Sequence, residues 1–148
     1  MSGILERIRA DQKQAMKASA RARLSALRLI ANDLHNRRIE LGRDLSDEEA
    51  IEVLTRALKK RREAEEQYAR AGRADRAAAE AAEADVIREY LPEPIDPAAL
   101  DALIEAAIAE TGAASVRDMG RVMGQLMAQV KGRVDGAEVS RRVRERLS

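Results

Sequence analysis

Residues 91–97 read Leu-Pro-Glu-Pro-Ile-Asp-Pro (LPEPIDP), and all three prolines of the chain fall in this stretch. Proline lacks an amide donor and restricts the residue before it, so no helix continues through such a segment. The stretch therefore predicts a boundary between two domains. We expect an N-terminal helical domain over residues 1–91, a proline-rich linker over residues 92–97 and a C-terminal domain over residues 98–148.

The composition on both sides of this boundary is that of helices. The chain has 148 residues, of which 45% are hydrophobic and 36% charged, and it has no Phe or Trp. Ala, Leu, Glu and Arg dominate, and these residues favour helices over strands. We therefore predict an all-α protein.

Apolar residues at helical spacing predict four helices before the boundary. The first has Leu5, Ile8 and Met16 on one face, with Ser2 available as its cap, and the others cover about 20–41, 46–72 and 74–90. Ser46 and Glu49 have the spacing of a capping box. The last two helices have thin apolar faces, which predicts a helical hairpin that projects from the body or packs lightly against it. The mixed charges of residues 59–76 are typical of a solvated helix surface.

Three short helices are expected after the boundary. The first begins at Asp96 and Pro97, a favourable cap and first helical residue, and stops at Gly112. A looser capping box at Ser115 opens the second. The third begins at Asp135, and its apolar residues are Val139, Val143 and Leu147.

The charge is distributed unevenly although the net charge is only +1. Residues 1–41 hold nine Lys or Arg against four acids, residues 42–100 hold ten against fifteen, and residues 111–148 hold eight against four. Basic ends suggest an acidic or polyanionic partner, although an excess of this size also occurs on ordinary solvated helices. There is no cysteine, and no apolar run is long enough to span a membrane, so we expect a soluble cytoplasmic protein.

Two groups of glycines lie in residues 118–136. Gly120 and Gly124 lie on one face of a helix, where they form a shallow trough that another helix or a nucleic-acid phosphate could approach. Gly132 and Gly136 permit left-handed backbone in the link that follows. Lys131 and Arg133 lie on this link. They either form a phosphate-binding site with the N-terminus of the next helix or neutralise the partial negative charge at the C-terminus of the preceding helix.

The residues of this region resemble the GatB/YqeY family. The string Met119-Gly120-Arg121-Val122-Met123-Gly124-Gln125-Leu126-Met127, followed by Lys131-Gly132-Arg133-Val134-Asp135-Gly136, carries the resemblance. The segment Glu89-Tyr90-Leu91-Pro92 and the opening Leu-Glu-Arg-Ile-Arg-Ala-Asp also look like stand-alone YqeY-like members. The resemblance extends over essentially the whole chain.

The resemblance implies tRNA contact rather than chemistry. The chain looks like the helical tail of the aspartyl/glutamyl-tRNA amidotransferase B subunit, which grips tRNA while a separate catalytic domain acts as a carbon–nitrogen ligase with glutamine as amido donor. The implied partners are tRNA and an amidotransferase or an aminoacyl-tRNA synthetase, in translation. The candidate nucleic-acid contacts are Arg117, Arg121, Lys131, Arg133, Arg141 and Arg142, and the candidate glycines for close backbone approach are Gly120, Gly124, Gly132 and Gly136.

The residues themselves predict neither catalysis nor a cofactor. His35 is the only histidine and has no second His or Cys to form a metal set, so we expect it to be a half-exposed helix residue. The sequence contains no nucleophile elbow and no phosphate-binding loop motif. The alternative to an RNA-binding module is a protein-interaction module that uses the acidic hairpin of residues 42–100 or a methionine-lined groove.

Overall fold

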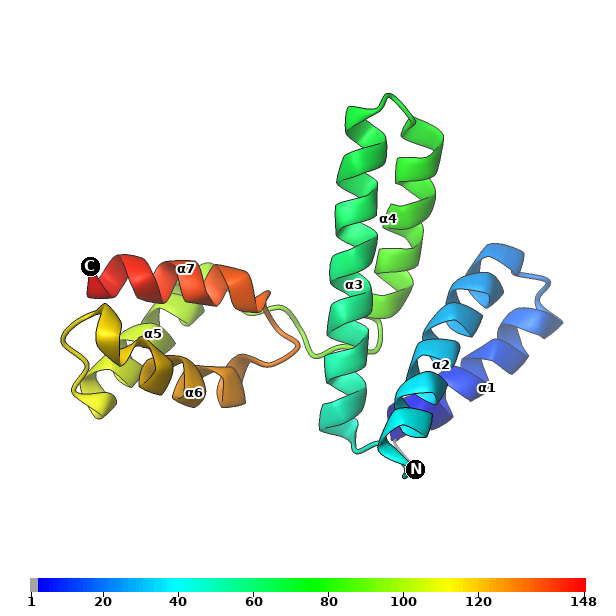
Figure 1. Ribbon diagram of the computed structural model, residues 1–148. Coiled ribbons are helices and arrows are strands. Elements are labelled where there is room, and N and C mark those ends of the chain that lie inside the picture. The colour runs from blue at the N-terminus through cyan, green and yellow to red at the C-terminus, as the bar shows by residue number, and fades with distance from the viewer. Residues whose placement is uncertain (1–2) are drawn as a thin grey trace. The chain divides into compact units, whose positions relative to one another are not determined.

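The computed structural model describes residues 3–148 and is all helical over that range, which confirms the predicted fold class (Figure 1). Ser2, the expected first cap, lies outside the described residues. The chain divides into two compact units, Met1–Leu91 and Pro92–Ser148. The first unit contains α1 (Gly3–Lys17), α2 (Arg21–Leu41), α3 (Asp47–Arg70) and α4 (Ala74–Arg88). The second contains α5 (Pro97–Thr111), a 3-10 turn η1 (Val116–Asp118), α6 (Met119–Val130) and α7 (Gly136–Leu147).

The first unit is built from two helical hairpins, α1–α2 and α3–α4 (Figure 1). Its core joins all four helices and includes the fully buried Ile8, Leu27, Leu34, Leu54 and Ile87. Local signals fix the ends of the helices. Gly42 ends α2 in a left-handed conformation with φ of +69°, and the predicted capping box is present, with the Ser46 hydroxyl accepting from the Glu49 amide.

The prediction that Met16 faces the core was wrong. Met16 is 59% exposed, whereas its neighbour Ala15 is only 4% exposed. An α-helix turns by about 100° per residue, so Ala15 lies about 20° from the direction of Ile8 and Met16 about 80° from it. At this end of α1 the buried face of the helix is therefore the face that contains Ile8 and Ala15.

The charge cluster of residues 59–76 is not wholly solvated. Arg61 of α3 forms ion pairs with Glu80 at 3.4 Å and Glu83 at 3.3 Å, both on α4. All three side chains are less than one-third exposed. Burial raises the pKa of the Glu83 carboxyl, and the Arg61 guanidinium opposes that effect. Arg61 therefore bridges the two helices of the hairpin.

The second unit packs α5, α6 and α7 around its own core. Val122, Leu126, Val139 and Val143 are fully buried there, and the partly buried Leu103 lies at the edge. The expected helix starts are present with two differences. The Ser115 capping box opens the turn η1 before α6 begins, and Asp96 occupies the cap position of α5 without a side-chain cap hydrogen bond.

The proline-rich segment before α5 is bonded to the second unit. The Ile95 amide donates to the carbonyl of Arg133 at 3.0 Å, and the Arg133 guanidinium donates through Nε to the carbonyl of Glu93 at 3.0 Å. Ile95 is buried in the core of the second unit. Arg133 thereby fixes this segment against the turn between α6 and α7.

Candidate nucleic-acid interface

The trough formed by Gly120 and Gly124 is open in the structure. Both glycines are exposed on α6, and a Cβ built on either would meet no atom within 4 Å. Ala128, one turn further along the same face, is also exposed. Packing of a neighbouring helix within the unit therefore does not explain the two glycines.

This open position leads to a prediction about stability. Replacing Gly120 and Gly124 together by Ala should raise the free energy of unfolding by about 1 kcal/mol at each site, because Ala loses less backbone entropy in an exposed helix. Urea denaturation followed by circular dichroism would measure the change. A loss of stability in the double variant would contradict the open trough.

Arg117 in η1 and Arg121 in the first turn of α6 are the first two candidate arginines, and their surroundings differ. The Arg121 guanidinium bonds to the Asp118 carboxylate at 2.7 Å and to the Thr111 carbonyl at 3.1 Å. Its contact lowers the pKa of Asp118, after the larger effect of the hydrogen bond from the Ala114 amide. Arg117 is exposed, and its side chain has no partner among residues 3–148.

The turn between α6 and α7 provides the next two candidate cations, Lys131 and Arg133. Gly132 has the left-handed conformation expected of it, with φ of +79°. Gly136 does not have a positive φ, because it is the first residue of α7, and a Cβ there would make an ordinary contact of 3.7 Å with Met127. The Asp135 carboxylate already accepts from the Ala137 amide at the start of α7. The Asp135 carboxylate therefore already occupies part of the predicted phosphate-binding site at the start of α7.

The last two candidates, Arg141 and Arg142 on α7, belong to a network of ion pairs. Both contact Glu138, and their hydrogen bonds lower the pKa of that carboxyl to about 2. Arg142 also reaches Asp101 on α5 at 2.8 Å. The contact with Asp101 joins α7 to α5, so Arg142 helps to hold the unit together, whereas the ion pairs of Arg141 stay within α7.

The six candidate cations are therefore not gathered at one point. Arg117 in η1 and Arg121 lie near one end of α6, and Lys131 follows its other end; Arg121 and Lys131 are ten residues apart, which corresponds to about 15 Å along the helix. Gly120, Gly124 and Ala128 lie between these cations on one exposed face of α6, which we call the open strip. Among the six candidates, only Arg117 has a guanidinium with no partner in the part of the chain that the structure describes.

The methionines of α6 do not form an open groove. Met119, Met123 and Met127 are partly buried and pack against the core of the second unit. Their flexible side chains fill gaps at the edge of that core. The interpretation of these residues as ordinary core packing is therefore favoured over a docking groove.

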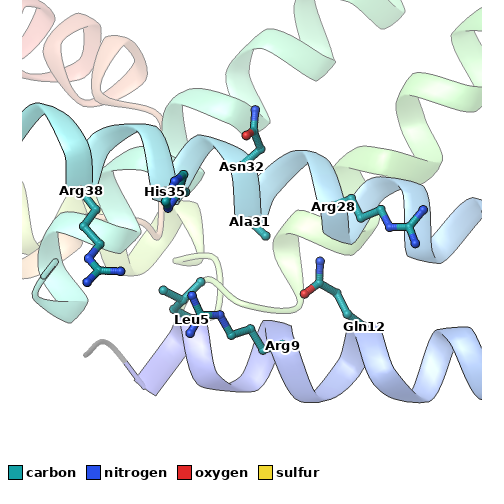
Figure 2. Close-up of a pocket in the computed structure, with 8 residues that line it drawn as sticks. All are labelled: Leu5, Arg9, Gln12, Arg28, Ala31, Asn32, His35 and Arg38. Atoms are coloured by element: carbon teal, nitrogen blue, oxygen red, sulfur yellow. The ribbon is translucent and has the colours of Figure 1, made fainter.

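A cationic hollow in the first unit was missed from the sequence. It lies between α1 and α2 and is shown in Figure 2. Arg28, Asn32, His35 and Arg38 line it from α2. Their spacing of four, three and three residues on one helix face was a usable signal, but the contribution of Arg9 from α1 depends on how the hairpin closes.

A family model described as "Yqey-like protein" matches residues 5–147. No curated protein matches the chain. Within residues 3–148, no helix has the length and apolar character needed to cross a membrane, and no group of three or more His, Asp or Glu is placed to hold a metal ion.

Proposed function

Because the chain belongs to the YqeY-like family, we propose that it is a tRNA-binding helical module without an active site of its own. The resemblance of its glycine-bearing string to the amidotransferase B tail links this role to glutamine-dependent tRNA amidation or to another step of tRNA use. An amidotransferase or an aminoacyl-tRNA synthetase is the protein partner that this role implies.

The observation that supports the proposal most directly is the open strip on α6. Gly120 and Gly124 are exposed and leave space above the helix backbone, so a phosphate group can approach it closely. Arg117 and Arg121 stand at one end of this strip and Lys131 at the other. A smooth surface with cations at both ends suits a nucleic-acid backbone, which carries one negative charge per residue.

The chemistry of the surface favours recognition of phosphates and shape over reading of bases. Unpaired bases stack on aromatic side chains, and the chain has only two, Tyr68 and Tyr90. Tyr90 is 3% exposed and lies in the core of the first unit. Phosphate contacts position a protein on its nucleic acid but do not select a sequence.

The partner-free guanidinium of Arg117 gives the cleanest test of this proposal. Arg117→Glu should weaken the binding of labelled bulk tRNA by about tenfold, because it replaces a charge-assisted contact with a repulsive one. Fluorescence anisotropy at about 50 and about 200 mM salt would measure the affinity and its salt dependence. The matched control is Arg62→Glu, because Arg62 is exposed on α3 and also lacks a side-chain partner among the described residues.

Equal losses in the two variants would show a general effect of charge and would contradict a site on α6. No binding by the parent protein at the lower salt would remove the tRNA proposal altogether. The double variant Lys131→Glu, Arg133→Glu is a less selective test. Arg133 also donates a hydrogen bond to the backbone carbonyl of Glu93, so its replacement changes the structure as well as the charge. Docking of a protein on the hairpin of α3 and α4 stays a prediction that these experiments leave open.

A further inference from the structure

The hollow between α1 and α2 is lined by basic residues, with no carboxylate among its lining residues in the described part of the chain. Its volume is about 300 Å³. The residues around it come from the two helices of one hairpin (Figure 2). They are Leu5, Arg9 and Gln12 of α1 with Arg28, Ala31, Asn32, His35 and Arg38 of α2.

The polar groups of this lining are cations, amides and one imidazole. Three guanidiniums and the chain's only histidine surround the hollow, and no carboxylate is among the lining residues. Arg38 has an acidic partner outside the lining, since its Nε lies 2.8 Å from a carboxylate oxygen of Asp44. Arg28 has no side-chain partner within the described residues. Arg9 also has an interaction within the protein, so Arg28 is the guanidinium of the lining that is open to a negatively charged ligand.

The cations form a row rather than a cluster. Arg28 and Arg38 are ten residues apart on α2, which corresponds to about 15 Å along the helix. Figure 2 shows them at the two ends of the hollow, with Arg9 and Gln12 on the facing side of α1. A single phosphate cannot touch both ends of such a row. A ligand with several phosphates in line can contact neighbouring members of the row at the same time.

We propose that the groove between α1 and α2 binds a linear run of phosphates, supplied either by an RNA backbone or by a free polyphosphate-bearing molecule. Guanidinium groups match phosphate oxygens with paired hydrogen bonds, and the amides of Gln12 and Asn32 add neutral donors. This site lies in the first unit, so it goes beyond the proposed contact at α6 and does not depend on it.

His35 makes the proposal directly measurable, because the imidazole resonances of the only histidine report from the groove itself. We expect titration of the full chain with inorganic tripolyphosphate to move the His35 proton resonances until saturation. Arg28→Gln should weaken this binding by about tenfold, because it removes a charge-assisted contact. Arg62→Gln on α3 is the control and should titrate like the parent protein.

Three outcomes would overturn the proposal. The first is that the His35 resonances do not move to saturation, and the second is that Arg28→Gln titrates like Arg62→Gln. The third is that an oligoglutamate of equal charge binds as tightly as tripolyphosphate, since the groove would then recognise charge and not phosphate. Circular dichroism of each variant excludes unfolding as the cause.

A parallel titration with bulk tRNA identifies the source of the phosphates. Movement of the His35 resonances by tRNA, with competition from tripolyphosphate, assigns the groove to RNA. Saturation by tripolyphosphate without any response to tRNA assigns it to a free phosphorylated molecule. Arg117→Glu separates this site from the one on α6, because it should leave the tripolyphosphate titration unchanged whether or not the tRNA proposal holds.

Discussion

Replacing Leu126 by Ala should lower the free energy of unfolding of the second unit by about 3 kcal/mol, through lost burial and the cavity left behind. Leu126 is fully buried at the centre of α6, where it packs with Val122, Val139 and Val143. A unit of this size has little stability to lose. The variant should therefore shift the urea midpoint of this unit strongly.

The two units can be followed separately during this experiment. Both tyrosines lie in the first unit and the chain has no Trp, so tyrosine fluorescence reports only that unit. Far-ultraviolet circular dichroism reports helices of both units. We expect Leu126→Ala to split the dichroism transition and leave the fluorescence transition in place. Coincident shifts would show that the units unfold as one. Leu103→Ala, at the edge of the same core, should have a smaller effect.

Replacing Tyr90 by Ala should destabilise the first unit by about 3 to 5 kcal/mol, as expected for loss of a buried aromatic ring. Tyr90 is 3% exposed, its hydroxyl donates a hydrogen bond to the Asp11 carboxylate, and the Arg7 guanidinium lies 5.1 Å from the centre of its ring. The residue joins the end of α4 to α1. Urea denaturation followed by circular dichroism would measure the loss.

Tyr90→Phe is the matched control, because it keeps the ring and removes the hydroxyl. Its expected cost is about 2 kcal/mol, the usual contribution of a hydrogen bond to a charged group. Retention of full stability by Tyr90→Ala would contradict the packing of this ring, and a Phe variant as unstable as the Ala variant would assign the effect to the hydroxyl alone.

The hydroxyl also makes stability depend on alkaline pH. Burial, and next the hydrogen bond to Asp11, raise the pKa of Tyr90 above its usual value of 10.0. The folded protein then keeps the proton while the unfolded chain loses it. The contribution is fully present below pH 10.0 and falls as the pH rises through the folded pKa. The difference in the free energy of unfolding between the parent protein and Tyr90→Phe should therefore shrink above pH 10.0. A difference that stays constant as the pH rises would contradict this.

The elements of the fold could be predicted because their signals are local. Prolines, caps and helical spacing act within one turn of chain, so LPEPIDP, the Ser46 capping box and Asp135 needed no tertiary information. The burial of Met16 was predicted wrongly, since the direction of the core at that end of α1 is set by α2 and the helices beyond it.

For the candidate site, some properties could be predicted from the sequence and others depend on contacts between distant segments. The all-helical fold, the basic ends of the chain and the places of Gly120 and Gly124 on one helix face follow from the amino-acid sequence alone. Which cations are already bonded, such as Arg133 to Glu93 and Arg142 to Asp101, depends on the packed structure, and so does which cations are open, such as Arg28 and Arg117. The physical reason is that charge counts are a property of the chain, whereas an ion pair or a groove needs two segments that only folding brings together.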